Sequence, residues 1–273
     1  MKYFRPDSLD SAHKLFQQHK GKEVELLAGG TDLIPRFERG ASLPDYLIDL
    51  KHLSELNSIE VLDQTIKIGA LSTIQNIYDH AIIQSEFGAL HQAAFEFAGP
   101  QIRHRGTIGG NICNASPAGD LLPSLYVFDA TLTLQSSTGE RHIPLKDFIL
   151  GPGKTDLQKD ELLTTISIVR TGNESFFQKL GLRQSMAISV VNLACVFKGD
   201  LHDPEFLNIA VGALAPTVVT LDSFCAAFQK APDKLRNHLN LIDETISPID
   251  DIRATASYRS KVLKNLINDF LEV

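Results

Sequence analysis

Two glycine-rich segments carry residue types that could bind an anion through the backbone. In the first, 27–34, a β-prone run ends at Gly29-Gly30 and leads into Thr31 and Asp32, residues that typically begin a helix. The second, 106–111, has three glycines within five residues. Glycine lets the backbone turn sharply, and the N–H groups of such turns suit a phosphate. Two converging loops would suit a diphosphate better than one. Taken singly, the first segment also fits an ordinary strand-to-helix turn and the second a solvated basic loop.

Charged residues accompany the second segment. Arg103, His104 and Arg105 precede it and bring positive charge to an otherwise acidic chain. Asp120 follows it and has two interpretations. Its carboxylate could accept hydrogen bonds from ribose hydroxyls, or it could cap the next helix, and the residue type favours the cap.

Several familiar site motifs are absent from the sequence. There is no GxGxxG fingerprint for a nicotinamide cofactor, no GxSxG nucleophile turn and no HExxH metal helix. The run 151–155 resembles the end of a P-loop, but Phe148 stands where that motif needs glycine. Cys113, Cys195 and Cys225 lie far apart, so we expect no iron–sulfur cluster or structural zinc held by this chain alone.

Length and composition narrow the class of protein. At about 150 residues per domain, 273 residues suggest two domains, and 43% apolar residues fit a globular chain. A net charge of −7 argues against a nucleic-acid partner. No apolar run approaches the roughly 20 residues of a membrane span, and the N-terminus lacks a signal-peptide pattern. We therefore expect a cytoplasmic protein.

The elements that must position these residues can be predicted from periodicity and turn residues. Ser8 is expected to cap a first helix, and a compact βαβ-like unit is predicted over about 50 residues. Ser72 is expected to cap another helix. The segment 101–120, which is rich in Gly, Asn, Ser and Pro, is predicted to be a long functional loop. Strands are predicted at 24–28, 46–50, 59–61, 65–70, 131–136, 141–144 and 162–169. At least two of the three segments 176–182, 190–197 and 208–213 are also expected to be strands. Helices are predicted at 87–98, 121–130, 222–230, 232–246 and from Arg253 onward, and Thr171-Gly172-Asn173 is the expected domain boundary.

Five motifs in one order resemble a known family, the FAD-binding medium subunits of the molybdenum hydroxylases. They are Ala28 to Leu33; Gln101-Ile102-Arg103 leading into Thr107 to Asn111; Ala115-Ser116-Pro117 to Asp120; Phe176-Phe177 with Lys179 and Arg183; and Asp250-Asp251 to Tyr258-Arg259. The resemblance covers nearly the whole chain. His104 departs from it, because the family often has a smaller polar residue there.

The resemblance implies an α+β fold of two domains. Residues 1–172 would form a two-subdomain FAD-binding domain of the PCMH type, with a small subdomain at 1–55 and a larger one at 56–172. Residues 173–273 would form a C-terminal domain with a three-stranded antiparallel sheet and helices. The implied contacts with the FAD diphosphate are Leu27, Ala28, Gly29, Gly30, Thr31, Asp32, Leu33, Ile34, Thr107, Ile108, Gly109, Gly110 and Asn111. Phe97 and Ala98 would border the cofactor. Asp120 would contact its nucleotide half, and Leu163 and Lys179 would lie near the flavin. Lys179 reads equally well as a surface lysine.

The resemblance also implies an oxidoreductase subunit that transfers electrons. A molybdopterin-binding large subunit would oxidise the substrate, a small subunit would carry two-iron clusters, and this FAD would pass the electrons to NAD or another acceptor. Since 28–34 contains no histidine that could tether it, the FAD should be non-covalent. Two alternatives remain: a self-contained FAD oxidase or reductase, and a non-catalytic scaffold that has lost FAD.

Overall fold

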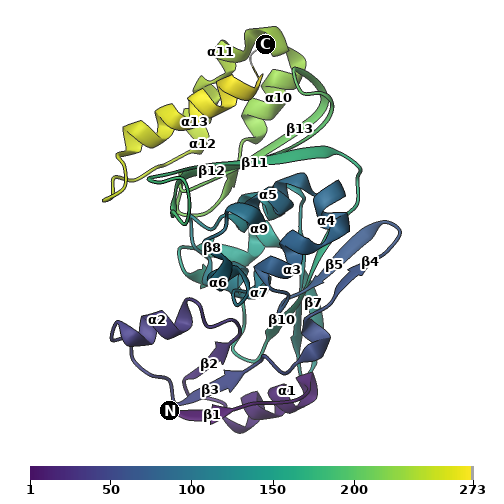
Figure 1. Ribbon diagram of the computed structural model, residues 1–273, viewed down its shortest axis with the longest axis vertical. Helices are drawn as coiled ribbons and strands as arrows, with labels where there is room; N and C mark the ends of the chain where they lie inside the picture. Colours follow the sequence, from purple (N-terminus) through teal and green to yellow (C-terminus); the bar gives the residue numbers. More distant parts are fainter. Residues whose placement is uncertain (272–273) are drawn as a thin grey trace.

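The computed structural model describes residues 1–271 and has three lobes, each built on a β-sheet (Figure 1). The lower lobe has a parallel sheet of order β1-β3-β2, formed by β1 (Lys2–Phe4), β3 (Tyr46–Asp49) and β2 (Val24–Leu27), with helices α1 (Leu9–Gln18) and α2 (Leu33–Glu38). Ser8 caps α1 in a reciprocal box with Ser11, as predicted. The predicted βαβ-like unit is confirmed, with β1 as an additional strand.

The middle lobe contains a five-stranded sheet in which all neighbouring strands are antiparallel. Its order is β4 (Ile59–Val61), β5 (Thr65–Gly69), β10 (Leu162–Val169), β6 (Thr131–Ser136) and β7 (Gly139–Pro144). A small hairpin pairs β8 (Ile149–Gly151) with β9 (Lys154–Thr155). The remaining elements are helices: η1 (Ser54–Leu56), α3 (Ile74–Asp79), α4 (Ala81–Glu86), α5 (Gly88–Glu96), α6 (Pro100–Arg103), α7 (Ile108–Asn114), α8 (Leu121–Val127) and α9 (Leu145–Phe148).

The upper lobe is an antiparallel sheet covered by helices on both faces. Its strands are β11 (Glu174–Gly181), β12 (Ser189–Asp200), β13 (Asp203–Gly212) and β14 (Val219–Thr220), in that order. Helices α5 and α8 of the middle lobe cover one face, while α10 (Asp222–Lys230) and α13 (Ala256–Leu271) cover the other (Figure 1). The short helices η2 (Pro232–Lys234), α11 (Leu235–His238) and α12 (Asn240–Thr245) complete the lobe.

Burial on both faces explains the nearly continuous apolar run of β12. Ala194 and Val196 belong to the core shared with the middle lobe, whereas Leu193 and Cys195 belong to the core under α10 and α13. Alternate side chains of a strand point to opposite faces, so each face of this strand packs on a different set of helices. The sheet therefore joins the two lobes through packed apolar surface.

Four sequence predictions differ from the structure, although the α+β class is confirmed. The upper sheet has a fourth, two-residue strand, β14, beyond the three predicted. The segment 101–120 contains α6 and α7 rather than a continuous loop. Thr73, not Ser72, caps α3. The helix predicted at 232–246 is broken into η2, α11 and α12. Within 1–271, no helix is long and apolar enough to span a membrane.

Candidate functional site

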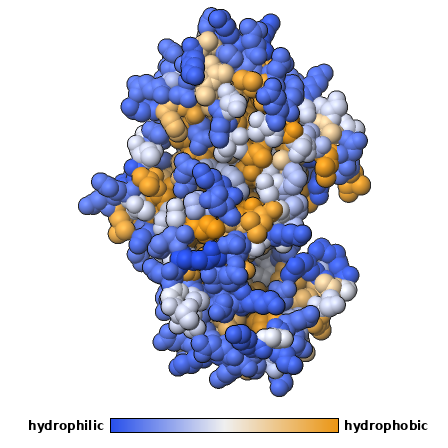
Figure 2. Space-filling model, turned by 180° about the vertical axis from the view of Figure 1, so that it is seen from behind, coloured by the Kyte–Doolittle hydropathy of each residue, from blue (hydrophilic) through white to orange (hydrophobic). Residues whose placement is uncertain are grey.

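A cleft of about 630 Å³ lies between the lower and middle lobes. It appears as a hollow above the lower lobe in the view from behind (Figure 2). Its volume falls within the roughly 300–1,000 Å³ typical of small-molecule sites. Both glycine-rich segments predicted from the sequence reach it. The predicted residues that line it are Ala28, Gly29, Gly30, Thr31, Asp32, Leu33, Phe97, Thr107, Gly109, Gly110, Asn111 and Leu163.

The first glycine loop offers a row of free backbone donors. Among the residues that the structure describes, no acceptor contacts the backbone N–H groups of 29–32. The left-handed conformation of Gly30, with φ of +75°, turns the chain between β2 and α2. Asp32 occupies the N-cap position of α2, but its side chain makes no capping bond. Successive N–H groups in such a turn form a concave site for an anion.

The second glycine loop differs, because most of its N–H groups already have acceptors in the protein. Ile108 N donates to Ser72 O at 3.0 Å, and Gly109 N donates to Ala70 O at 2.9 Å. Gly110 N donates to Thr107 Oγ1, the N-cap of α7, and Asn111 N donates to Thr107 O. The interpretation of this segment as a second loop of free donors is therefore wrong for 108–111.

The glycines of both loops are needed for protein packing. A Cβ at Gly29 would lie 2.0 Å from the carbonyl oxygen of Arg105, so the two loops touch through their backbones. A Cβ at Gly109 would lie 2.7 Å from the Cβ of Ala70. Such distances are far inside ordinary contact, so a side chain at either position would push two backbones apart. These glycines fix the distance between the walls of the cleft.

The side chain of Asn111 is the polar group that the second loop presents to the cleft. Asn111 lines the cleft, and its Oδ1 is buried without a hydrogen-bond partner among the described residues. Leaving a buried acceptor unpaired costs about 1–3 kcal/mol. An unpaired amide beside four free N–H groups indicates a polar ligand, so the residues present fit a cofactor with many acceptor and donor atoms.

The other predicted contacts lie outside the cleft lining. Leu27, Ile34 and Ile108 flank lining residues, and Ala98 adopts a strained left-handed conformation with φ of +43°. The basic residues 103–105 do not line the cleft either. Arg103 instead donates to the carbonyl oxygens of Phe95 and Phe97 at 2.9 and 3.4 Å and so holds the turn after α5.

Asp120 and Lys179 form a buried ion pair between the middle and upper lobes. Lys179 Nζ lies 2.6 Å from Asp120 Oδ2, and the two side chains are 5% and 9% exposed. Ser189 Oγ donates to Asp120 Oδ1 at 2.6 Å, and Asn192 Nδ2 donates to the same atom at 3.2 Å. The helix-capping role favoured for Asp120 is wrong, because its side chain makes no capping bond. The surface interpretation of Lys179 is also wrong. Their contact brings both groups to one point between the two lobes.

Sequence reasoning missed two parts of the cleft wall. One is the irregular segment after β9, and the other is an apolar end formed by α1, β2 and neighbouring turns. No local motif marks them, because they are assembled from positions far apart in the chain. The missed lining residues of these two parts include Phe16, Val24, Leu26, Leu50, Leu71, Thr155, Leu157, Gln158, Lys159 and Glu161.

Cys113 lines the cleft but is not a nucleophile. Burial raises the pKa of its thiol to about 12. The thiol therefore stays protonated at neutral pH, whereas reactive cysteines are thiolates. The cleft is thus suited to binding a ligand and not to covalent attack by this residue.

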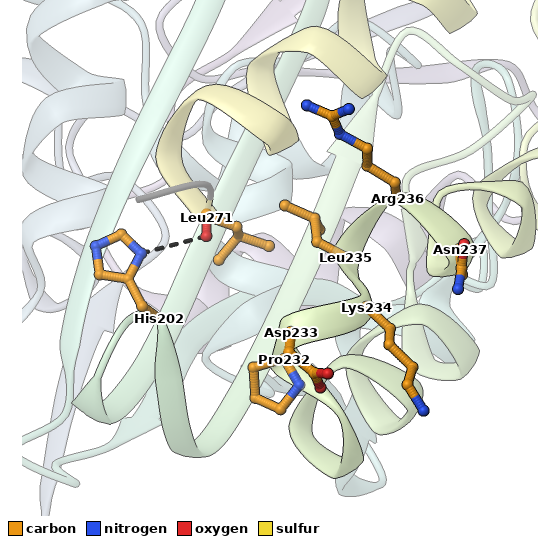
Figure 3. A pocket seen from close by; sticks show the side chains of 8 residues that line it. All are labelled: His202, Pro232, Asp233, Lys234, Leu235, Arg236, Asn237 and Leu271. Atoms are coloured by element: carbon orange, nitrogen blue, oxygen red, sulfur yellow. Dashed lines mark hydrogen bonds between the residues drawn. The ribbon is translucent and has the colours of Figure 1, made fainter.

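A second pocket, of about 390 Å³, lies on the upper lobe beside α11 (Figure 3). His202 Nδ1 contacts Leu271 O at 3.2 Å at its edge, and Lys234 and Asp233 lie on its opposite side. No residue predicted from the sequence lines this pocket. The clustering of both glycine segments selects the cleft between the lobes as the candidate site.

Comparison with known proteins agrees with the fold. The family model described as the FAD binding domain in molybdopterin dehydrogenase matches residues 1–169, and the CO dehydrogenase flavoprotein C-terminal domain matches residues 176–273. The chain is 41% identical to the nicotinate dehydrogenase FAD-subunit of Eubacterium barkeri over 203 residues, which are 72% of this chain and 69% of that one. It is 31% identical to the xanthine dehydrogenase FAD-binding subunit of Escherichia coli O157:H7, with 94% and 88% covered.

A solved structure shares the whole architecture. A chain of the carbon monoxide dehydrogenase from Hydrogenophaga pseudoflava superposes with a TM-score of 0.91 at 27% identity, with 99% of this chain and 96% of that chain covered. Both family models, the order of the motifs and the fold agree. The chain therefore belongs to the FAD-binding subunits of the molybdenum hydroxylases, a family of oxidoreductase components.

Proposed function

We propose that this chain binds one FAD non-covalently in the cleft, with the diphosphate against the free N–H groups of 29–32. That row of donors without acceptors is the observation that supports the proposal most strongly. Asn111, whose buried Oδ1 lacks a partner, would contact a polar group of the same ligand. The predicted division into 1–55, 56–172 and 173–273 would place the cofactor between the first two parts.

The proposed contacts fall into three groups. The cofactor would be touched directly by the lining residues that belong to the segments 28–33 and 107–111, and by Phe97 and Leu163. Leu27, Ile34, Ala98 and Ile108 would act through the backbone. Asp120 of the middle lobe and Lys179 of the upper lobe neutralise each other, so together they would present a polar, nearly uncharged group where these two lobes meet.

The proposed activity is electron transfer within an enzyme complex. FAD, when bound, supplies the redox chemistry, and the protein supplies binding and orientation. The partners would be a molybdopterin-binding large subunit and a small subunit with two-iron clusters, and the electrons would leave to NAD or another acceptor. The complex would work in the cytoplasm. The chain's own residues bind and orient the cofactor, and its described histidine, cysteine and carboxylate residues form no metal-binding group of three or more.

Coexpression with its genomic neighbours would test this function. We expect an assembly of three chain types with a flavin absorption spectrum, and acid precipitation should release yellow flavin into the supernatant. The isolated chain should reduce dyes with NADH slowly but should not hydroxylate a heterocycle.

Three results would oppose the proposal. Colourless folded protein that does not take up FAD would favour the scaffold. A flavin-containing monomer that oxidises an organic substrate alone would favour a self-contained enzyme. Flavin that stays in the acid pellet would contradict non-covalent binding.

A further inference from the structure

One wall of the cleft has no regular secondary structure of its own. The segment 156–161 connects β9 to β10, and Leu157, Gln158, Lys159 and Glu161 of this segment line the cleft. An irregular segment has many accessible conformations unless other parts of the protein hold it. The shape of this wall therefore depends on the contacts that fix it.

Arg141, on β7, holds both ends of this segment. Its Nε and Nη2 donate to the two carboxylate oxygens of Glu161 at 2.7 and 2.9 Å. Its Nη1 donates to Asp156 Oδ2 at 2.7 Å, and Nη2 also donates to Asp156 O at 2.8 Å. A planar guanidinium with paired contacts of this kind fixes geometry as well as charge.

Contacts within the segment complete the closed turn. Gln158 N donates to Glu161 Oε2 at 2.9 Å, and Glu161 N donates to Gln158 O at 3.1 Å. Gln158 Nε2 donates to Asp156 O at 2.8 Å. The hydrogen bond from Arg141 lowers the pKa of Glu161, so this carboxylate is charged at neutral pH, and Arg141 supplies the cation that pairs with it. Without Arg141, the carboxylates of Asp156 and Glu161 would lose the cation that pairs with both of them.

We propose that Arg141 is a positioning residue for the cofactor site. It does not line the cleft itself, and it acts by holding 156–161 in the conformation that the bound cofactor contacts. A preformed wall raises affinity because less ordering is needed on binding. This inference rests on the proposed binding of FAD in the cleft.

A second arginine provides a matched control. Arg170 also makes paired contacts with one carboxylate, Glu86, and donates to Leu62 O at 2.9 Å. Neither Arg170 nor Glu86 lines the cleft. The change Arg170→Gln therefore removes an ion pair of the same kind without touching the cofactor wall.

The experiment compares Arg141→Gln, Arg141→Lys and Arg170→Gln with the wild-type chain. The FAD dissociation constant is measured by titration, and hydrogen exchange is followed in the peptide covering 156–161. Misplacement of a binding wall has large effects, so Arg141→Gln should raise the dissociation constant about tenfold and speed exchange in 156–161. Arg141→Lys keeps the charge and should cause a smaller rise. Arg170→Gln should leave both readouts unchanged.

The outcomes separate this inference from the function on which it rests. If Arg141→Gln does not fold, Glu161→Gln, which removes the same ion pair, replaces it and should give the same rise. Wild-type affinity in either variant, or an equal loss in Arg170→Gln, would overturn the positioning role while FAD binding stands. A wild-type chain that does not bind FAD would overturn the proposed function, and this inference with it.

Discussion

The contact between the two glycine loops makes Gly29→Ala a severe change. A Cβ at Gly29 would lie 2.0 Å from the oxygen and 2.8 Å from the carbon of the Arg105 carbonyl, whereas ordinary contacts begin near 3.4 Å. Both neighbours are backbone atoms, so no side-chain rotation can relieve the clash. We expect a loss of about 1–3 kcal/mol in the free energy of unfolding, typical of overpacking. At about 2–4 °C per kcal/mol for a chain of this size, the melting temperature should fall by several degrees.

The same change should weaken FAD binding more than it weakens the fold. Separating the loops moves the N–H groups of 29–32 away from Asn111, and a displacement of about 1 Å can cost a hundredfold in a positioned interaction. Gly151→Ala is the matched control, because nothing lies within 4 Å of its Cβ. Melting followed by circular dichroism and FAD titration would measure both effects. Wild-type melting and wild-type affinity in Gly29→Ala would refute the reasoning.

Three further predictions follow from single contacts. Asn111→Leu should leave the stability of the cofactor-free chain nearly unchanged, since its Oδ1 has no partner, yet lower FAD affinity in a titration; equal affinity would refute the assigned contact. Lys179→Met should lower the free energy of unfolding by about 3–5 kcal/mol, because it leaves the buried Asp120 carboxylate without its cation, and adding Asp120→Asn should restore part of this loss in denaturant melts. Arg141 lowers the pKa of Glu161 in the folded chain, so the Glu161 carboxylate becomes protonated at a higher pH in the unfolded chain than in the folded one. The stability that the Arg141–Glu161 ion pair contributes is therefore present at neutral pH and lost as the pH falls below about 4.3. Glu161→Gln should make the melting temperature depend less on pH in that range.

The strands could be predicted because their patterns are local. Alternating or continuous apolar residues predicted most strands of the three sheets, but not the short β1 and β14, and Ser8 predicted the start of α1. Two of the short helices gave no such signal. Helix α6 has four residues, too few for a helical period to show, and the seven residues of α7 include Gly109 and Gly110, which are poor helix formers. Both were predicted as loop for that reason.

The cap of α3 shows another limit of sequence reasoning. Ser72 and Thr73 are both good capping residues, and only their environment decides between them. Ser72 Oγ donates to Ser58 O at 3.3 Å, whereas Thr73 accepts from Asn76 N. Residue type alone could not distinguish the two positions.

The site could be located from sequence, but its chemistry could not be read fully. Gly29 and Gly30 form a contiguous motif that predicted the anion-binding loop. Whether an N–H group is free depends on tertiary partners, and those of 108–109 are bonded to Ser72 and Ala70. The wall that Arg141 holds is likewise built from separate strands and a turn. Contiguous motifs therefore identify a site, while its unpaired groups appear only in the folded chain.

Hydrogen exchange of the chain with and without FAD tests the central claim most directly. The account predicts slower exchange in a peptide covering 29–32, whose N–H groups have no acceptor in the cofactor-free chain. The N–H groups of 108–111 should change little, because protein oxygens already accept them. Protection that appears instead around 232–237 on the upper lobe, with 29–32 unchanged, would contradict FAD binding in the cleft.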